Sequence, residues 1–341
     1  MSKLRIALDA MGGDYAPLET VKGAIEAINE NKKITVILVG KEDLIKKELS
    51  KYEYDKNRIE IKHASEVIEM DEKVAPTTVV RAKKDASMNV ALQMVKDGEA
   101  VACVSAGNTG ALMTASQLKL KRIKGVLRPA ITTVFPAKNN HHIVLLDAGA
   151  NADCKPEYLD QFATMANEYA KILLNIEKPK TGLLNIGEED GKGNELTKAA
   201  FHLLKENTNI DFYGNIESRD MIDGDVDIVV TDGFTGNIVL KTAEGTADFM
   251  KNIIKEEIGK SLLAKVGALF MIPVFKNLKR KSSSSEYGGA LFMGLNGISI
   301  KAHGNSDSKA IKNAISVGNK FAENNFIEGL TKVIGGQNEK N

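Results

Sequence analysis

The sequence predicts an α/β fold in which helices cover both faces of a mostly parallel sheet. Short apolar runs alternate along the chain with segments of helical periodicity. The runs are nearly continuous in Val, Ile and Leu, as is typical of strands that are buried on both faces of a parallel sheet. Most runs end in a polar, glycine-containing turn, and no repeat of fixed period indicates a solenoid.

The first unit of strand, turn and helix sets the pattern for the rest of the chain. We expect a strand at 4–8, a glycine-rich turn at 9–14, and a helix at 18–28 with apolar residues at helical spacing. An antiparallel hairpin is expected where 134–136 stands beside 141–146. Further strands are expected at 35–39, 100–105, 143–146, 182–186 and 226–231, and further helices at about 42–51, 111–119, 156–174, 195–206 and after 237.

The length of the chain, 341 residues, suits one large α/β domain or two ordinary ones. No stretch rich in Pro, Ser or Gly marks a linker between two halves, and 282–285 is the only low-complexity stretch. We therefore expect a single α/β catalytic domain over 1–341, from which an amphipathic helical segment at about 255–285 projects.

The composition excludes several classes of protein. Because 46 basic side chains are balanced by 45 acidic ones, a dedicated nucleic-acid-binding protein is not expected. The two cysteines lack zinc-ligand spacing, so they predict neither a disulfide framework nor a metal site and favour a reducing compartment. No secretory signal pattern is present, and the longest apolar run, 266–275, is far shorter than the roughly 20 residues of a membrane-spanning helix. We expect a cytoplasmic protein.

Gly, Asp, Asn and Thr gather in the turns after five predicted strands. Ligands of open α/β sheets bind outside the carboxyl ends of the strands, and glycine lets the backbone approach an anion at a helix N-terminus. Five such loops on one edge predict a pocket for a phosphate-bearing ligand, although ordinary turn chemistry explains any one of them. Neither GxGxxG nor a P-loop pattern is present. The loops centre on Asp9/Gly12/Gly13, Gly107–Gly110, Asp147/Asn151, Lys192–Asn194 and Asp232–Asn237.

Two cationic or titratable side chains suggest contact with such a ligand. Arg81 is one of only seven arginines and lies in a predicted helix over 75–88, where its guanidinium could hold phosphate bidentately. A solvated helix face explains the neighbouring Lys83 and Lys84 equally well. His303 follows a strand and precedes a helix, a position that suits a general base or donor, or else a packing residue. Covalent catalysis is the weaker interpretation, because no Cys or Ser has a marked histidine partner.

Six phrases of the sequence point to one family when they are taken in order. They are LDAMGGDYAP (8–17), SAGNTGA (105–111), LDAGAN (146–151), LNIGE with KGNE (184–195), TDGFTGN (231–237), and YGGA through AHGN (287–305). Together they resemble the bacterial phosphate acyltransferases, acyl-ACP:phosphate acyltransferase, over about residues 4–325. Each phrase alone is weak, and the six in order are specific.

The resemblance implies a Rossmann-like three-layer α/β/α fold, related to phosphotransacetylase and isopropylmalate dehydrogenase, and a homodimer. It implies reversible transfer of a fatty acyl group from acyl carrier protein to inorganic phosphate. The acyl phosphate would feed phospholipid synthesis through a membrane-bound glycerol-3-phosphate acyltransferase. Neither a cofactor nor a metal is expected, because phosphate is itself the nucleophile and a thiol with a pKa of about 8.5 leaves readily.

This chemistry assigns expected roles to the candidate residues. Asn237 and His303 are the candidates for orienting phosphate or the thioester carbonyl oxygen. Two other functions stay open: a nicotinamide- and metal-dependent dehydrogenase of related fold, and a non-enzymatic scaffold that binds lipid or carrier. The residues expected to bind phosphate or substrate are Gly12, Gly13, Arg81, Asn108, Thr109, Gly110 and Asn194.

Two surface segments predict contacts with partners. Lys121 and Arg122 belong to a basic stretch after the helix that begins near Asn108, and we expect them to dock the acidic carrier. Between 258 and 285 there are six basic and no acidic residues, with apolar residues at helical spacing and a helix break at Pro273. This composition is typical of an interfacial anchor on an anionic membrane, with Leu269 and Phe270 in contact with lipid. A helix pair packed in a dimer or in the core would show the same apolar stripe.

Overall fold

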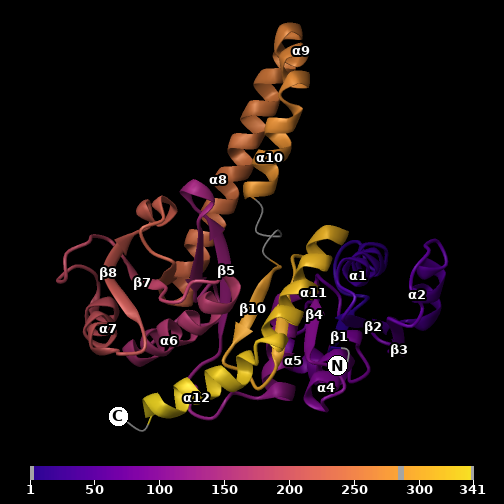
Figure 1. Ribbon diagram of the computed structural model, residues 1–341, viewed down its shortest axis with the longest axis horizontal. Coiled ribbons are helices and arrows are strands. Elements are labelled where there is room, and N and C mark those ends of the chain that lie inside the picture. The colour runs from indigo at the N-terminus through magenta and orange to yellow at the C-terminus, as the bar shows by residue number, and fades with distance from the viewer. Residues whose placement is uncertain (1–3, 283–287, 339–341) are drawn as a thin grey trace.

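The computed structural model describes residues 4–282 and 288–338 of the chain. Within these residues, eleven strands form one sheet in the order β3-β2-β1-β4-β11-β10-β5-β6-β9-β7-β8. Helices cover both faces of the sheet (Figure 1), which confirms the predicted three-layer α/β/α arrangement. The strands are β1 (Leu4–Asp9), β2 (Ile34–Gly40), β3 (Ile59–His63), β4 (Ala102–Ser105), β5 (Ala130–Pro136), β6 (His142–Leu146), β7 (Lys180–Asn185), β8 (Asp211–Glu217), β9 (Ile228–Val230), β10 (Ala290–Met293) and β11 (Ile298–Lys301).

The direction of the strands reverses in the middle of the sheet. Seven of the pairings in the described part of the chain are parallel, and the three antiparallel ones are consecutive, β11 with β10, β10 with β5, and β5 with β6. An odd number of reversals places the carboxyl ends of β1, β4 and β11 on one edge, here called the first edge. The carboxyl ends of β6, β7 and β9 lie on the other, the second edge. The prediction that five glycine-rich loops share one edge is therefore wrong.

The core differs between the two faces of the sheet. On one face α1, α2, α6, α7, α11 and α12 contribute to a single apolar cluster that extends across both halves. On the other face α3, α4 and α5 cover one cluster under the first half, and a separate cluster lies under the second half beside the start of α8. The α-helices are α1 (Leu18–Glu30), α2 (Glu42–Leu49), α3 (Pro76–Ala82), α4 (Ser87–Lys96), α5 (Thr109–Leu120), α6 (Pro156–Leu173), α7 (Glu195–Glu206), α8 (Gly233–Lys260), α9 (Leu262–Phe270), α10 (Ile272–Ser282), α11 (Ser308–Glu323) and α12 (Phe326–Asn338).

Most elements expected from the pattern are confirmed, including the antiparallel pair of β5 and β6. The predicted helix over 75–88 is instead two helices, α3 and α4, separated at residues 83–86. The Asn89 side chain donates to the carbonyl oxygens of Val80 (3.0 Å) and Lys83 (2.7 Å), which satisfies the end of α3. The pattern did not predict β3, β8 or β10: β8 and β3 are largely polar, and β10 is an apolar run of only four residues.

Helices α8, α9 and α10 project from the body, with α9 at the tip (Figure 1). The predicted break at Pro273 falls two residues earlier, at Met271, because Pro273 occupies the first turn of α10. A further break at Ser261, whose hydroxyl oxygen accepts from the Ala264 amide at 3.3 Å, separates α8 from α9 and was not predicted. Residues 283–285 and Tyr287, which the sequence analysis singled out, lie outside the described residues, as do the side chains of Lys279, Arg280 and Lys281.

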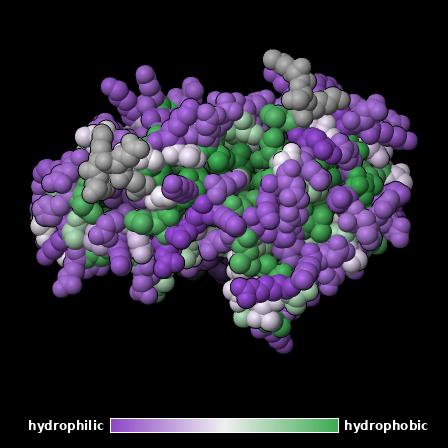
Figure 2. All heavy atoms as spheres, turned by 90° about the horizontal axis from the view of Figure 1, so that it is seen from below, coloured by the Kyte–Doolittle hydropathy of each residue, from purple (hydrophilic) through white to green (hydrophobic). Residues whose placement is uncertain are grey.

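The exterior of the body is mostly hydrophilic, as the 27% content of charged residues predicts. Seen from below, hydrophilic side chains cover both flanks and apolar side chains gather along the middle (Figure 2). Among the helices of the described residues, none is long and apolar enough to cross a bilayer.

Candidate active site

Three neighbouring parallel strands end in polar residues that form a row at the first edge. Asp9 ends β1, Ser105 ends β4, and Lys301 ends β11 in register with Ser105. All three side chains are buried, and Ser105 Oγ donates to Asp9 Oδ2 at 2.6 Å. The strands that follow β1 in the chain, β2 and β3, lie on one side of it, and β4 lies on the other. The strand order therefore reverses between β1 and β4, and open α/β sheets bind ligands at such a switch point.

Asp9 organises the turn that follows β1. The amides of Met11 and Gly12 and the hydroxyls of Ser87 and Ser105 donate to its carboxylate. Burial raises the pKa of Asp9 above its ordinary range, and these hydrogen bonds oppose the rise. The Gly12 amide is therefore engaged by Asp9, and the expected contact of Gly12 with phosphate stays a prediction.

The glycines of the first edge let three loops touch. A Cβ on Gly12 would lie 2.5 Å from Asp9 Oδ2 and 2.8 Å from the Gly107 nitrogen, so the loops after β1 and β4 are in backbone contact there. Gly13, at φ +105°, would place a Cβ 3.1 Å from the Gly304 carbonyl oxygen in the loop after β11. The Asp14 amide donates to that same oxygen at 2.8 Å. At Gly12 and Gly13 the touching loops thus have room for glycine only, which lets their backbones come close together.

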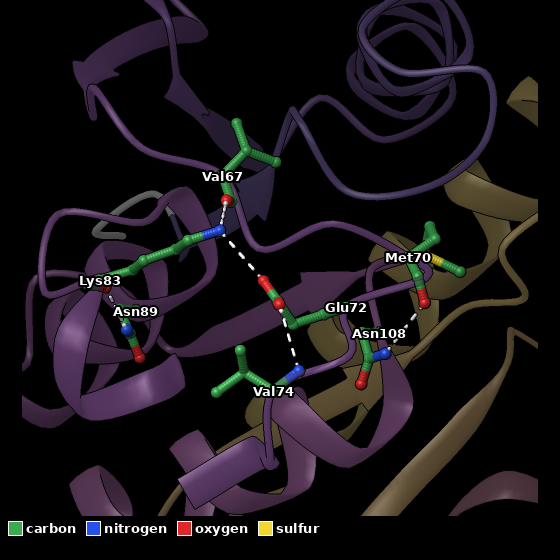
Figure 3. Close-up of polar contacts among 7 residues, drawn as sticks. All are labelled: Val67, Met70, Glu72, Val74, Lys83, Asn89 and Asn108. Carbon is green, nitrogen blue, oxygen red and sulfur yellow. Dashed lines mark hydrogen bonds and ion pairs between the residues drawn. The ribbon is translucent and has the colours of Figure 1, made fainter. Parts of the chain in front are cut away.

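Asn108 is engaged at both ends of its side-chain amide, and Figure 3 shows its contact with Met70. Its Oδ1 accepts from the Ala111 amide at 2.9 Å, which caps α5, and its Nδ2 donates to the Met70 carbonyl oxygen at 3.0 Å. The loop that carries Met70 is held in turn by Lys83, which bonds the Val67 carbonyl oxygen (3.0 Å) and Glu72 Oε2 (3.1 Å). Asn108 therefore positions the start of α5 and the loop above it.

Thr109 and Gly110 follow this cap, and Arg81 lies on the neighbouring helix α3. Thr109 and Gly110 form the first turn of α5, where the amides of a helix and its dipole favour an anion. A Cβ on Gly110 would lie 3.1 Å from Pro76 Cγ, so α3 begins beside α5. Arg81 is exposed about 7 Å further along α3. The structure thus gathers Gly12, Gly13 and the start of α5 at the first edge, with the start of α3 beside them.

His303 also belongs to the first edge, in the loop after β11. Its Nε2 lies 3.4 Å from Glu244 Oε1 on α8, and its side chain is 55% exposed. Helix α8 begins at the second edge, after β9, and contacts His303 from the start of its fourth turn. Asn237 lies in the second turn of α8, about 10 Å along the helix axis from Glu244. Asn237 is therefore close to the start of α8, whereas His303 contacts the helix further along.

The second edge carries its own ordered loop, after β6. The Asp147 carboxylate accepts from the amides of Ile131, Gly149, Ala150 and Asn151 at 2.8–3.1 Å and is buried, which raises its pKa. A Cβ on Gly149 would lie 3.5 Å from the Asn237 side chain, so this loop and the start of α8 are neighbours.

Asn194 is an N-cap, with Oδ1 accepting from the Thr197 amide at 2.9 Å at the start of α7. It follows β7, whose carboxyl end lies at the second edge, away from Gly12 and Asn108. Because the two edges are separated by the length of the strands, Asn194 does not join the phosphate loops that the sequence analysis grouped with it.

The expected carrier-docking residues lie at the far end of α5. Lys121 follows that helix as its C-cap, about 20 Å along its axis from Asn108, and is exposed. The Arg122 guanidinium donates to the carbonyl oxygens of Val126 (3.2 Å) and Leu127, so it holds the turn that follows. Asn151 Nδ2 donates to the Pro129 carbonyl oxygen at 2.8 Å, which places this basic stretch beside the second edge.

The cysteines and acidic groups suggest no other chemistry. Cys103 is fully buried, and burial raises the pKa of the half-buried Cys154 to about 12, so neither thiol is an activated nucleophile. No group of three or more His, Cys, Asp or Glu side chains is arranged to hold a metal within the described ranges. A cavity of about 600 Å³ lies elsewhere, between the β5–β6 hairpin tip and α11, and its lining includes none of the loops above.

Sequence reasoning missed Ser105 and Lys301 as parts of the site. Both end buried, mostly apolar strands, and a polar residue at the carboxyl end of such a strand is a signal for a site. The signal becomes specific only when β4 and β11 are known to be neighbours, because the two residues are 196 positions apart in the sequence.

Comparisons with known proteins agree with the resemblance of the phrases. The family described as "Fatty acid synthesis protein" matches over residues 4–329. The phosphate acyltransferase of Fusobacterium nucleatum subsp. nucleatum is 59% identical over 331 residues, 97% of this chain and 99% of its own. That of Dictyoglomus thermophilum is 48% identical over 334 residues, 97% of this chain and 98% of its own.

Solved structures share the fold at low sequence identity. A phosphotransacetylase from Streptococcus pyogenes is 17% identical with a TM-score of 0.64, over 94% of each chain. A 4-hydroxythreonine-4-phosphate dehydrogenase from Klebsiella pneumoniae is 12% identical with a TM-score of 0.54, over 94% of this chain and 100% of its own. The expected fold relation to phosphotransacetylase is confirmed, and the relation to isopropylmalate dehydrogenase stays a prediction.

Proposed function

The chain belongs to the phosphate acyltransferase family of enzymes, and from that premise we propose that it transfers a fatty acyl group from acyl carrier protein to inorganic phosphate. An oxygen of monohydrogen phosphate bonds to the thioester carbonyl carbon, and the C–S bond breaks. Sulfur leaves with the bonding electron pair and takes up the proton that phosphate carried. The products are an acyl phosphate and the free carrier thiol.

The observation that carries the proposal is the backbone contact of the loops after β1 and β4 at the switch point of the sheet. There the first turn of α5 offers the Thr109 and Gly110 amides, and α3, which begins beside α5, carries Arg81. Because Gly13 has no side chain, its backbone lies against that of Gly304, in the loop that carries His303. These groups bind a phosphate dianion by amide donors and one guanidinium, with no bound cofactor or metal ion.

Catalysis then depends on orientation and on stabilising the oxyanion that forms at the thioester carbonyl. We assign His303, at the first edge, to the phosphate side of the substrate. Asn237 approaches from α8 and is assigned to the thioester side. Asn194, at the second edge, is left with its capping role in this scheme.

A purified assay tests the function. We expect loss of acyl carrier thioester that depends on inorganic phosphate, with the acyl phosphate trapped by hydroxylamine as a hydroxamate. The protein should bind phosphate without added metal or nucleotide, and its Tm should rise with phosphate concentration. At 100 times Kd, bound phosphate should add about 2.7 kcal/mol to the free energy of unfolding. Chloride at equal ionic strength controls for general salt effects.

The two alternatives predict different results. A dehydrogenase of related fold would show a Tm shift with NAD(P) or a divalent ion and none with phosphate; the likeness to 4-hydroxythreonine-4-phosphate dehydrogenase is one of fold alone. A carrier- or lipid-binding scaffold would bind its partner and leave the thioester intact.

The proposal extends to partners and location. Acyl phosphate is a reactive amphiphile, so a membrane-bound glycerol-3-phosphate acyltransferase in phospholipid synthesis is the proposed consumer, and a cytoplasmic enzyme that associates peripherally with an anionic membrane suits delivery. Exposed apolar residues of α9 support the membrane contact, with Leu269 at 65% and Phe270 at 82% exposure. None of the α9 side chains is buried within this chain, so the core-packing alternative does not explain their stripe.

A homodimer is proposed from α8. Beyond Glu244 nearly all of its residues are exposed, although Phe249, Met250, Ile253 and Ile254 are large and apolar. A second copy packed along this part of α8 would cover them, while the tip at α9 would stay free to meet lipid.

A further inference from the structure

Lys301 is the one lysine that is buried among the described residues, with 9% of its surface exposed. It ends β11 beneath the loops of the first edge. A buried ammonium costs free energy relative to an apolar side chain of similar length, so packing alone does not explain its presence. Burial accordingly lowers its pKa from 10.5 to about 8, against the opposing attraction of Asp9 and Asp14.

The ammonium group joins two loops of the proposed phosphate site. Lys301 Nζ donates to the carbonyl oxygen of Ala106, at 3.3 Å, and to that of Ala302. Ala106 directly precedes Gly107 and Asn108, which lead into α5, and Ala302 directly precedes His303. One side chain therefore ties the loop before the α5 amides to the loop that carries the histidine.

The charged surroundings of Lys301 favour its protonated form near neutral pH. Asp9 on β1 and Asp14 in the following loop face it, and both are acidic. Its register neighbours on β4 and β10, Ser105 and Ala290, are uncharged. The Lys301 ammonium thus lies close to two aspartates, beneath a site that must accept an anion. Its positive charge offsets the repulsion between these aspartates and the bound anion.

We propose that Lys301 is a positioning residue of the phosphate site, holding the loops 106–110 and 302–307 in the arrangement that binds inorganic phosphate. This inference rests on the proposed function. Loss of the proton removes the charge and weakens both hydrogen bonds to the carbonyl oxygens. Phosphate binding should therefore be strong while Lys301 is protonated, and should weaken as the pH rises through its pKa.

Three variants test this role: Lys301→Met, Lys301→Arg, and Lys312→Met as the matched control. Lys312 forms an ion pair with Glu30 (2.6 Å) on α1, away from the first edge. At pH 7 we expect Lys301→Met to raise the KM for phosphate at least tenfold, with the KM for the acyl carrier within twofold of wild type. Lys312→Met should leave both unchanged.

The pH profile separates positioning from a merely structural role. In the wild type, Kd for inorganic phosphate by calorimetry should rise above pH 8, approaching tenfold per pH unit. Lys301→Met should show no such rise. Lys301→Arg should recover part of the affinity at pH 7 and keep it up to pH 10, because guanidinium does not titrate there.

An unchanged KM for phosphate in Lys301→Met, or a rise above pH 8 that persists in Lys301→Arg, would overturn the proposal. Should Lys301→Met fail to fold, the pH dependence of Kd for phosphate in the wild type and in Lys301→Arg still tests the proposal. If the wild type binds phosphate with the expected pH dependence but consumes no thioester, the positioning role stands and the proposed function fails. A wild type that binds no phosphate overturns both.

Discussion

His303 Nε2 lies 3.4 Å from Glu244 Oε1, so the loop after β11 is in contact with the start of the fourth turn of α8. The two residues come from opposite halves of the sheet, and beyond this contact α8 leaves the body and projects toward α9. The contact therefore links the proposed phosphate site to the base of the projecting helices. It also gives His303 a neighbour other than substrate, which makes its role in catalysis testable.

Substitution at this pair should separate substrate contact from a structural role. We expect His303→Ala to lower kcat about 100-fold, because a donor that acts in the transition state contributes about 2–4 kcal/mol. Glu244→Gln should lower kcat less than threefold, since the pair is half-exposed and worth little by itself. Steady-state kinetics at saturating phosphate measure both. Equal losses in the two variants would show that His303 acts only through α8.

Arg81 should contribute to phosphate binding without supporting the fold. Its side chain is exposed, and the end of α3 is satisfied by Asn89 rather than by the guanidinium. We expect Arg81→Ala to lower kcat/KM for phosphate by about 30- to 1,000-fold, equivalent to about 2–4 kcal/mol, with Tm unchanged. Arg81→Lys should recover only part, because lysine cannot bind bidentately. Turnover near that of wild type in Arg81→Ala would exclude the guanidinium from the site.

Carrier docking is best tested with the exposed lysines of the basic stretch. Arg122 holds the carbonyl oxygens of Val126 and Leu127, so its reversal would disturb the turn as well as the charge. We expect Lys121→Glu with Lys124→Glu to raise KM for the acyl carrier and to flatten its salt dependence, with KM for phosphate unchanged.

Lys32→Glu with Lys33→Glu makes the same change of charge at another exposed site, after α1, and should leave KM for the carrier as it is. If both double variants change KM equally, the effect comes from net charge, and the docking surface lies elsewhere.

Membrane contact should depend on the tip of the projecting helices. We expect Leu269→Glu with Phe270→Glu to abolish binding to anionic vesicles, while activity with soluble substrate and the oligomeric state stay as in the wild type. Wild-type binding should weaken with salt, because each nearby basic residue contributes about 1 kcal/mol. Vesicle co-sedimentation and size-exclusion chromatography provide the readouts.

Leu44→Glu with Tyr213→Glu is the matched control, since both side chains are about half exposed on the body, at 42% and 52%. It should bind vesicles as the wild type does. Dissociation or unfolding of the Leu269 and Phe270 variant would instead identify α9 as a packing element between copies.

The sequence by itself determined the local elements, the family and most of the candidate residues of the loops. Strand and helix periodicity, and glycine in turns, are properties of neighbouring residues, so 4–8 and 18–28 could be placed from the pattern. The apolar stripe of 258–270 was equally visible in the sequence, although its exposure was not.

Which of these residues meet depends on how distant segments pack together. Three consecutive antiparallel pairings divide the glycine-rich loops between two edges, and such pairings join segments that are far apart in the chain. The same long-range order places Lys301 beside Ser105 and buries it, and engages Asn108 with Met70. Burial and hydrogen bonding depend on what packs against a side chain, and a single sequence does not state its neighbours in space.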